Sequence, residues 1–208
     1  MAFIVPPPRS SPDAGPGRAG PGPITPGPAA LARWYEQRLG WATEGRAPVR
    51  LLTGIRFDVL ELPAEAGHAL LRRPVRTGPV LLSGGRVGLL VAAGGADELP
   101  GLLDWLEWGP IGLDLTASGA GGRITAPSPR GGGAGSPGAA VWLRPPEPRH
   151  VPGPALPALA GFGSSGGDAP DLVRLVDAAA TECHRVRLSR ARAGLRKGSP
   201  ADQPLAFS

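Results

Sequence analysis

The chain has 208 residues, and its 33 glycines and 27 prolines form a share typical of sequences with long segments that do not fold. The formal net charge of +5 favours polyanionic partners, unless that charge lies mainly in a tail. A single cysteine, Cys183, excludes an intramolecular disulfide and any zinc site with two or more cysteine ligands.

The uneven spread of proline and glycine predicts a folded middle between two loose ends. Residues 1–28 have no periodic apolar pattern, so they cannot bury enough surface to offset the entropy of ordering. We expect this disordered arm to be followed by a domain at 29–146, a Pro/Gly-rich connector at 147–167, an amphipathic helix at 168–184 and a basic disordered tail at 185–208.

The domain is predicted to be α+β, with a mixed or antiparallel sheet of short strands and helices packed against it. Helical spacing of apolar residues predicts helices at 29–39, 64–73 and 97–106, the last of them capped by Asp97. Apolar runs predict strands at 49–54, 57–62, 111–116, 123–127 and 141–146. Between residues 78 and 93, two apolar runs flank the turn Ser83-Gly84-Gly85-Arg86, which predicts a β-hairpin.

Three carboxylates lie in or beside these predicted strands: Asp58, Glu61 and Asp114. Carboxylates on adjacent strands can hold Mg²⁺ against a nucleotide triphosphate. Asp58 and Glu61 are an odd number of residues apart, so on one strand they point to opposite faces. Cys183 and His184 are adjacent on a predicted helix and point about 100° apart, so we do not expect them to form a catalytic pair.

Residues 29–146 resemble the N-terminal domain of bifunctional DNA primase/polymerases, a branch of the archaeo-eukaryotic primase superfamily. The likeness is carried by four segments in order: Leu52-Thr-Gly-Ile-Arg-Phe-Asp-Val-Leu-Glu-Leu-Pro63, Leu82-Ser-Gly-Gly-Arg86, Gly112-Leu-Asp-Leu115 and Gly121-Gly-Arg-Ile-Thr-Ala-Pro-Ser128. The resemblance implies nucleotidyl transfer with Mg²⁺ or Mn²⁺. It makes Glu61 and Asp114 the catalytic and metal-binding acids, and it implies nucleotide contacts at Ser83, Gly84, Gly85 and Arg86.

Two departures from the family pattern indicate a degenerate site. The family carries Asp-x-Asp on its first catalytic strand, whereas the matching positions here are Glu61 and Pro63. The hairpin histidine of the family falls near Val87, which cannot donate to a phosphate. We therefore expect Glu61 and Asp114 to be vestigial and no cofactor to be bound, with Mg²⁺ or Mn²⁺ required only if catalysis persists.

Three hypotheses for the function remain open. The first is a catalytically degenerate primase/polymerase-like domain that binds DNA or RNA through basic residues of the tail, namely Arg185, Arg187, Arg190, Arg192, Arg196 and Lys197. The second is an active metal-dependent nucleotidyltransferase. The third is a regulatory or scaffolding protein that binds a protein partner through residues 1–28. No signal peptide and no apolar run of about 20 residues is present, so a cytoplasmic protein without membrane contact is expected.

Overall fold

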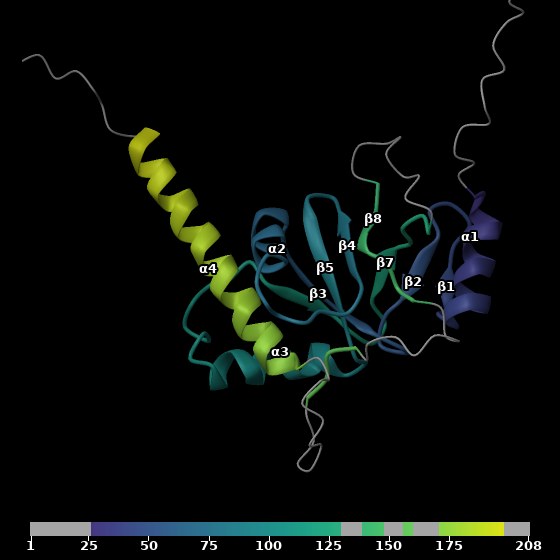
Figure 1. Cartoon of the computed structure of the whole chain (residues 1–208), viewed down its shortest axis with the longest axis horizontal. Coiled ribbons are helices and arrows are strands. Elements are labelled where there is room, and N and C mark those ends of the chain that lie inside the picture. The colour runs from purple at the N-terminus through teal and green to yellow at the C-terminus, as the bar shows by residue number, and fades with distance from the viewer. Residues whose placement is uncertain (1–25, 130–138, 148–155, 160–170, 198–208) are drawn as a thin grey trace, which may run out of the picture.

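The computed structural model describes residues 26–129, 139–147, 156–159 and 171–197 (Figure 1). The helices in this part of the chain are α1 (Pro28–Trp34), its π-helical continuation η1 (Tyr35–Leu39), α2 (Ala64–Leu70), α3 (Gly95–Trp105) and α4 (Leu172–Lys197). The strands are β1 (Thr43–Glu44), β2 (Arg50–Leu52), β3 (Asp58–Pro63), β4 (Val80–Ser83), β5 (Arg86–Val91), β6 (Thr116–Ser118), β7 (Arg123–Thr125) and β8 (Val141–Arg144).

The strands form two antiparallel sheets, which confirms the predicted α+β class. A small sheet has the order β1-β2-β7, and a larger one has the order β6-β3-β5-β4-β8. In the larger sheet, the chain runs β3-α2-β4-β5-α3-β6 with its first and third strands in the centre. This is the ferredoxin-like βαββαβ arrangement, extended by β8 at the edge beside β4.

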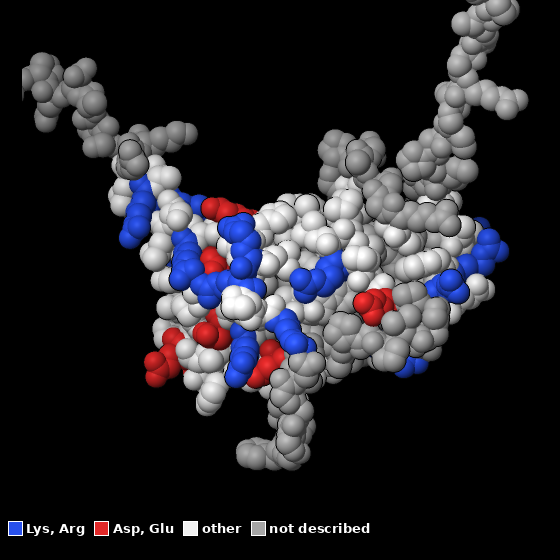
Figure 2. Space-filling view, in the orientation of Figure 1, with Lys and Arg blue, Asp and Glu red and all other residues white. Residues whose placement is uncertain are grey.

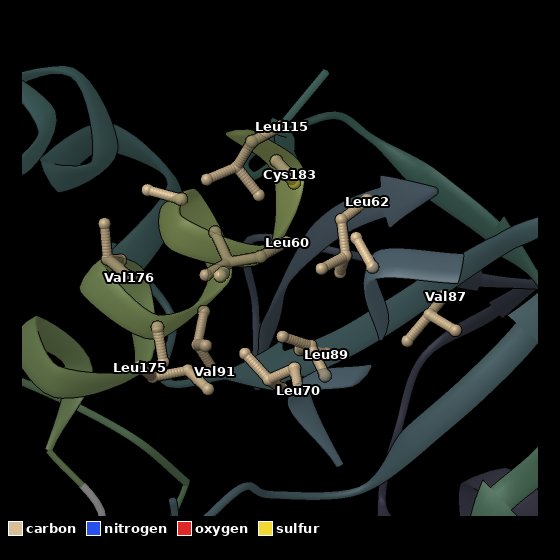
Figure 3. Packing of buried hydrophobic residues seen from close by; sticks show 14 of the residues in the cluster. Leu60, Leu62, Leu70, Val87, Leu89, Val91, Leu115, Leu175, Val176 and Cys183 are labelled. Atoms are coloured by element: carbon tan, nitrogen blue, oxygen red, sulfur yellow. The ribbon is translucent and has the colours of Figure 1, made fainter. Parts of the chain in front are cut away.

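The larger sheet is buried on both faces because its strands alternate apolar side chains between two cores. Leu60 and Leu62 of β3 pack on the face covered by α2, α3 and α4 (Figure 3). Val59, which points the other way, packs with Tyr35 and Trp41 in a second core beneath η1. Each fully buried leucine contributes roughly 2 kcal/mol through removal of apolar surface from water. Of the two acids of β3, Asp58 is buried, whereas Glu61 is half-buried and lies opposite the exposed Thr116.

The helix α4 corrects the predicted boundary at residue 184. The structure shows one helix from Leu172 to Lys197, so a disordered tail beginning at Arg185 was wrong for the segment up to Lys197. Alanine, arginine and leucine dominate this segment and are strong helix formers, and a helix already anchored by packing extends without a new nucleation cost. The first half of α4 also packs onto α2 and α3, so this helix belongs to the domain itself.

Two further boundaries differ from the sequence-based prediction. The expected strand at 111–116 is absent from the described residues, and β6 begins only at Thr116. Asp114 therefore precedes a strand and does not occupy the centre of one. The helix α3 begins at Gly95, two residues before Asp97, with Gly94 as its capping residue. This early start has a physical reason: the Asp58 side chain of β3 accepts hydrogen bonds from the Gly94 and Ala96 N–H groups.

Candidate functional site

Glu61 and Asp114 approach each other at the β3–β6 edge of the larger sheet. Strands β3 and β6 are neighbours, and Glu61 lies opposite Thr116, two residues after Asp114. Arg86, the first residue of β5, joins the three strands. Its guanidinium donates to an Asp114 carboxylate oxygen at 2.7 Å, to the Glu61 carbonyl oxygen at 3.0 Å and to Thr116 Oγ1 at 3.4 Å. The structure therefore brings the predicted hairpin arginine to the carboxylate of Asp114 and to the backbone, but not the carboxylate, of Glu61.

The chemistry of this group does not fit a two-metal site. Asp114 is already paired with a guanidinium, which supplies the positive charge that a metal ion would bring. Among the described residues, no group of three or more His, Cys, Asp or Glu side chains could hold a metal ion. Pro63 ends β3 and begins α2 as its capping residue, so it offers no ligand atom. No step through a metal ion can be derived from these side chains.

The turn between β4 and β5 has a backbone conformation that favours glycine at two positions. Gly84 and Gly85 have φ values of +55° and +79°, and two consecutive positive φ values are what a tight two-residue hairpin turn requires. A Cβ atom at either position would meet nothing within 4 Å, so close approach of another group does not explain them. Ser83 lies opposite Arg86 across the hairpin, and Val87 is buried in the core under α2. Nucleotide contact by Ser83, Gly84, Gly85 and Arg86 stays a prediction.

Asp58 has a structural role that the sequence analysis missed. Its side chain is buried, and its Oδ2 atom accepts hydrogen bonds from the backbone N–H groups of Gly94 at 2.8 Å and Ala96 at 2.9 Å. These N–H groups belong to the first turn of α3, where the helix dipole favours a negative charge. Asp58 therefore caps α3 from a neighbouring strand, in the place predicted for Asp97. It faces the helix side of the sheet, opposite to Glu61, as the alternation along the strand predicts.

The pair Cys183 and His184 is not a nucleophilic site. Cys183 is buried, and burial raises the pKa of its thiol to about 12, with a further contribution from the charge of Asp114. Its sulfur lies 3.7 Å from the Asp114 carbonyl oxygen, whereas the His184 ring packs against Trp108 at a centroid distance of 5.7 Å. A thiol that stays protonated at neutral pH and has no base beside it does not attack a substrate.

Exposed basic side chains gather along α4 (Figure 2). Four arginine residues of the second half are exposed: Arg185, Arg187, Arg190 and Arg192. Val186 is the last buried residue among the described side chains of the helix. Arg185 pairs with Glu182 at 3.0 Å, and Arg190 lies 3.9 Å from Glu65 of α2. Arg196 and Lys197 continue the same helix, but their side chains lie outside the described part of the chain.

Comparison of the chain with known protein families, with curated proteins and with solved structures found no match. Within the described residues, no helix is long and apolar enough to cross a membrane. Three expected segments lie mostly outside the described residues: the arm at 1–28, the connector at 147–167 and the tail after Lys197. The expected binding of a protein partner by the arm is therefore not tested by the structure.

Proposed function

We propose that this chain is a primase/polymerase-like domain that has lost metal-dependent catalysis and binds nucleic acid through the second half of α4. One observation carries the binding part of the proposal: the charges of α4 are separated along its length. Asp171, just before the helix, and Asp177 and Glu182 in its first half are the acids of this region. The segment from Arg185 to Lys197 contains no acid.

The first half of α4 packs against the domain, and its two acids, Asp177 and Glu182, have partners there. Glu182 is buried, and its carboxylate forms ion pairs with Arg73 at 2.5 Å and with Arg185 at 3.0 Å. Beyond Val186 no residue of the helix with a described side chain is buried. Arginine on a helix that stands free of its domain is available to phosphate oxygens, which it binds through paired N–H donors.

The loss of catalysis is supported by what has become of each expected acid. Asp114 is paired with Arg86, and Asp58 caps α3. Only Glu61 is left with a carboxylate that has no partner among the described residues. One carboxylate cannot clamp two metal ions, and phosphoryl-type transfer depends on that neutralisation and positioning.

The test is equilibrium binding to a fluorescein-labelled nucleic acid, with two matched double variants. Arg187→Gln with Arg192→Gln removes two charges from α4, and we expect affinity to fall about tenfold because two phosphate contacts are lost. Arg33→Gln with Arg38→Gln removes the same charge from exposed positions at the opposite end of the molecule (Figure 1) and should leave affinity unchanged. Equal losses in both variants would show that only net charge matters, and no binding by the unaltered protein would overturn the proposal.

An active nucleotidyltransferase is the competing function, and the observation that favours it is that Glu61 and Asp114 both lie near Arg86, through the Glu61 backbone carbonyl and the Asp114 carboxylate. Primer extension by the pure protein with Mg²⁺ or Mn²⁺ decides between the two. Activity that disappears in both Glu61→Ala and Asp114→Ala would replace our proposal. Inactivity with both metals is the expected outcome.

A further inference from the structure

The second half of α4 is a free helical rod attached to the domain at one end. In Figure 1 the helix continues beyond the larger sheet, and the residues from Arg187 to Leu195 are all exposed. At 1.5 Å per residue, the segment from Arg187 to Lys197 is roughly 16 Å long, and a helix with its side chains is about 10–12 Å wide. Among the described side chains of this segment, Arg190 forms an ion pair with Glu65 of α2 at 3.9 Å.

The outward face of this rod alternates arginine and leucine. Arg185, Leu188, Arg192 and Leu195 recur at intervals of three, four and three residues, which places them on one side of the helix. The two leucine residues are 42% and 76% exposed. A basic face with apolar positions between the charges can contact phosphates at its edges, and base edges and thymine methyl groups at its centre.

This helix lacks the feature that single-strand binding depends on. Proteins that bind single strands combine a basic groove with aromatic side chains on which the bases stack. From Leu172 to Lys197, α4 carries no Phe, Tyr or Trp residue. The most exposed tryptophan of the described residues, Trp105, lies on α3 between Asp104 and Glu107, where negative charge opposes a polyanion.

We propose that the second half of α4 inserts into the major groove of duplex DNA. The inference rests on the proposed function and names the nucleic acid that the same surface takes. The major groove of B-form DNA is about 12 Å wide and admits a helix, whereas the major groove of A-form RNA is too narrow and deep for side chains to read. Asp177 and Glu182 in the first half of α4, and Glu65 beside Arg190, repel phosphate groups. Contact with DNA is therefore expected only at the projecting end of the helix.

The experiment compares three labelled probes of one sequence: a DNA duplex of about two helical turns, one of its single strands, and the corresponding RNA duplex. We expect the DNA duplex to bind about tenfold more tightly than either of the others at the same salt concentration. Equal or tighter binding of the single strand or the RNA duplex overturns this inference but leaves nucleic-acid binding in place. Failure to bind any probe overturns the proposed function as well, and so does binding to anionic lipid vesicles in the absence of any nucleic-acid binding.

A proline substitution separates helix geometry from charge. Ala191→Pro breaks the exposed half of α4 while keeping every arginine, and Ala191→Ser is the matched control. The change lies beyond the last buried residue, so the thermal unfolding of the domain should not shift by more than a degree or two. We expect Ala191→Pro to lose the preference for duplex DNA and to bind it no more tightly than the single strand. A retained preference in this variant would show that the helix does not enter the groove.

Discussion

The β3–β6 edge of the larger sheet and the projecting end of α4 both carry charged residues that were predicted to be functional, and the two regions differ in how these charges are paired. At the β3–β6 edge, Asp114 pairs with Arg86, and Asp58 on the other face of β3 caps α3. At the end of α4, Arg187 and Arg192 have no acidic partner among the described residues. Charge that is matched within the fold stabilises it, whereas unmatched charge is available to a partner. Four measurements test this contrast.

The largest expected effect is on stability, at the cap of α3. Asp58→Ala removes the acceptor for the N–H groups of Gly94 and Ala96 and should lower the free energy of unfolding by about 2–3 kcal/mol. Asp97→Ala alters an exposed acid in the first turn of the same helix and should cost less than about 0.5 kcal/mol. Chemical denaturation measures both values. Equal costs would mean that Asp58 is not the cap.

The next effect concerns the unmatched charge of α4. If about four arginine residues contact phosphates, the affinity for duplex DNA should fall by about a hundredfold when the salt concentration rises fourfold. The double variant Arg187→Gln with Arg192→Gln should make the slope of log affinity against log salt concentration shallower by about 1.8, which corresponds to the loss of two phosphate contacts. Fluorescence anisotropy across a salt series gives both slopes. Affinity that does not respond to salt would exclude phosphate contacts.

The third effect is a loss of stability at alkaline pH caused by Cys183. Its thiol titrates near pH 9 when the chain is unfolded and near pH 12 in the fold, so the folded state binds more protons in this window. Stability should therefore fall as pH rises above 9, by up to about 1.4 kcal/mol per pH unit from this group. Burial also raises the pKa of Tyr35, which adds a loss of the same sign.

The control for this prediction is Cys183→Ala, compared with the unaltered protein at each pH. The variant should lose less stability between pH 9 and 11 than the unaltered protein does. Its free energy of unfolding at neutral pH should be lower, because alanine fills less of the buried space around position 183. Thermal unfolding at each pH measures the difference. Parallel curves for the two proteins would assign the alkaline loss to other groups.

The smallest effect is expected at Arg86. The Arg86 and Asp114 side chains are 32% and 53% exposed, so solvent screens their ion pair. A double-mutant cycle with Arg86→Ala and Asp114→Ala should give a coupling free energy below about 1 kcal/mol. A coupling of several kcal/mol would make this pair a main stabilising element of the β3–β6 edge.

The elements predicted correctly from the sequence are those with local signals. The paired glycines after Ser83 predicted the hairpin, and Gly40, with φ of +64°, ends η1 as expected for a helix stop. Alternation along β3 placed Asp58 and Glu61 on opposite faces. These features depend on neighbours within a few residues, so one short stretch of sequence contains all the information they need.

The features that sequence reasoning missed depend on distant partners. Asp58 caps a helix whose first turn lies 36 and 38 residues further along the chain, and only the pairing of β3 with β5 brings the two together. Arg86 of β5 reaches Asp114, which precedes β6, across 28 residues because β5 and β6 pair with the two sides of β3. A signal for the first contact was the Gly94-Gly95 pair shortly after β5, where backbone N–H groups at a helix start can donate to a carboxylate.

The sequence by itself determined the α+β class, the main strands, the hairpin and the concentration of arginine near the end of the chain, because periodicity and composition are local properties. Only the tertiary structure decided which charges are satisfied and which are left free. An ion pair or a cap requires two groups at a distance of about 3 Å, and folding alone sets that distance for residues far apart in the chain. The same acids and arginine residues could have formed a metal site in another register. In this fold they hold strands and a helix together, and the unpaired arginine residues project on α4.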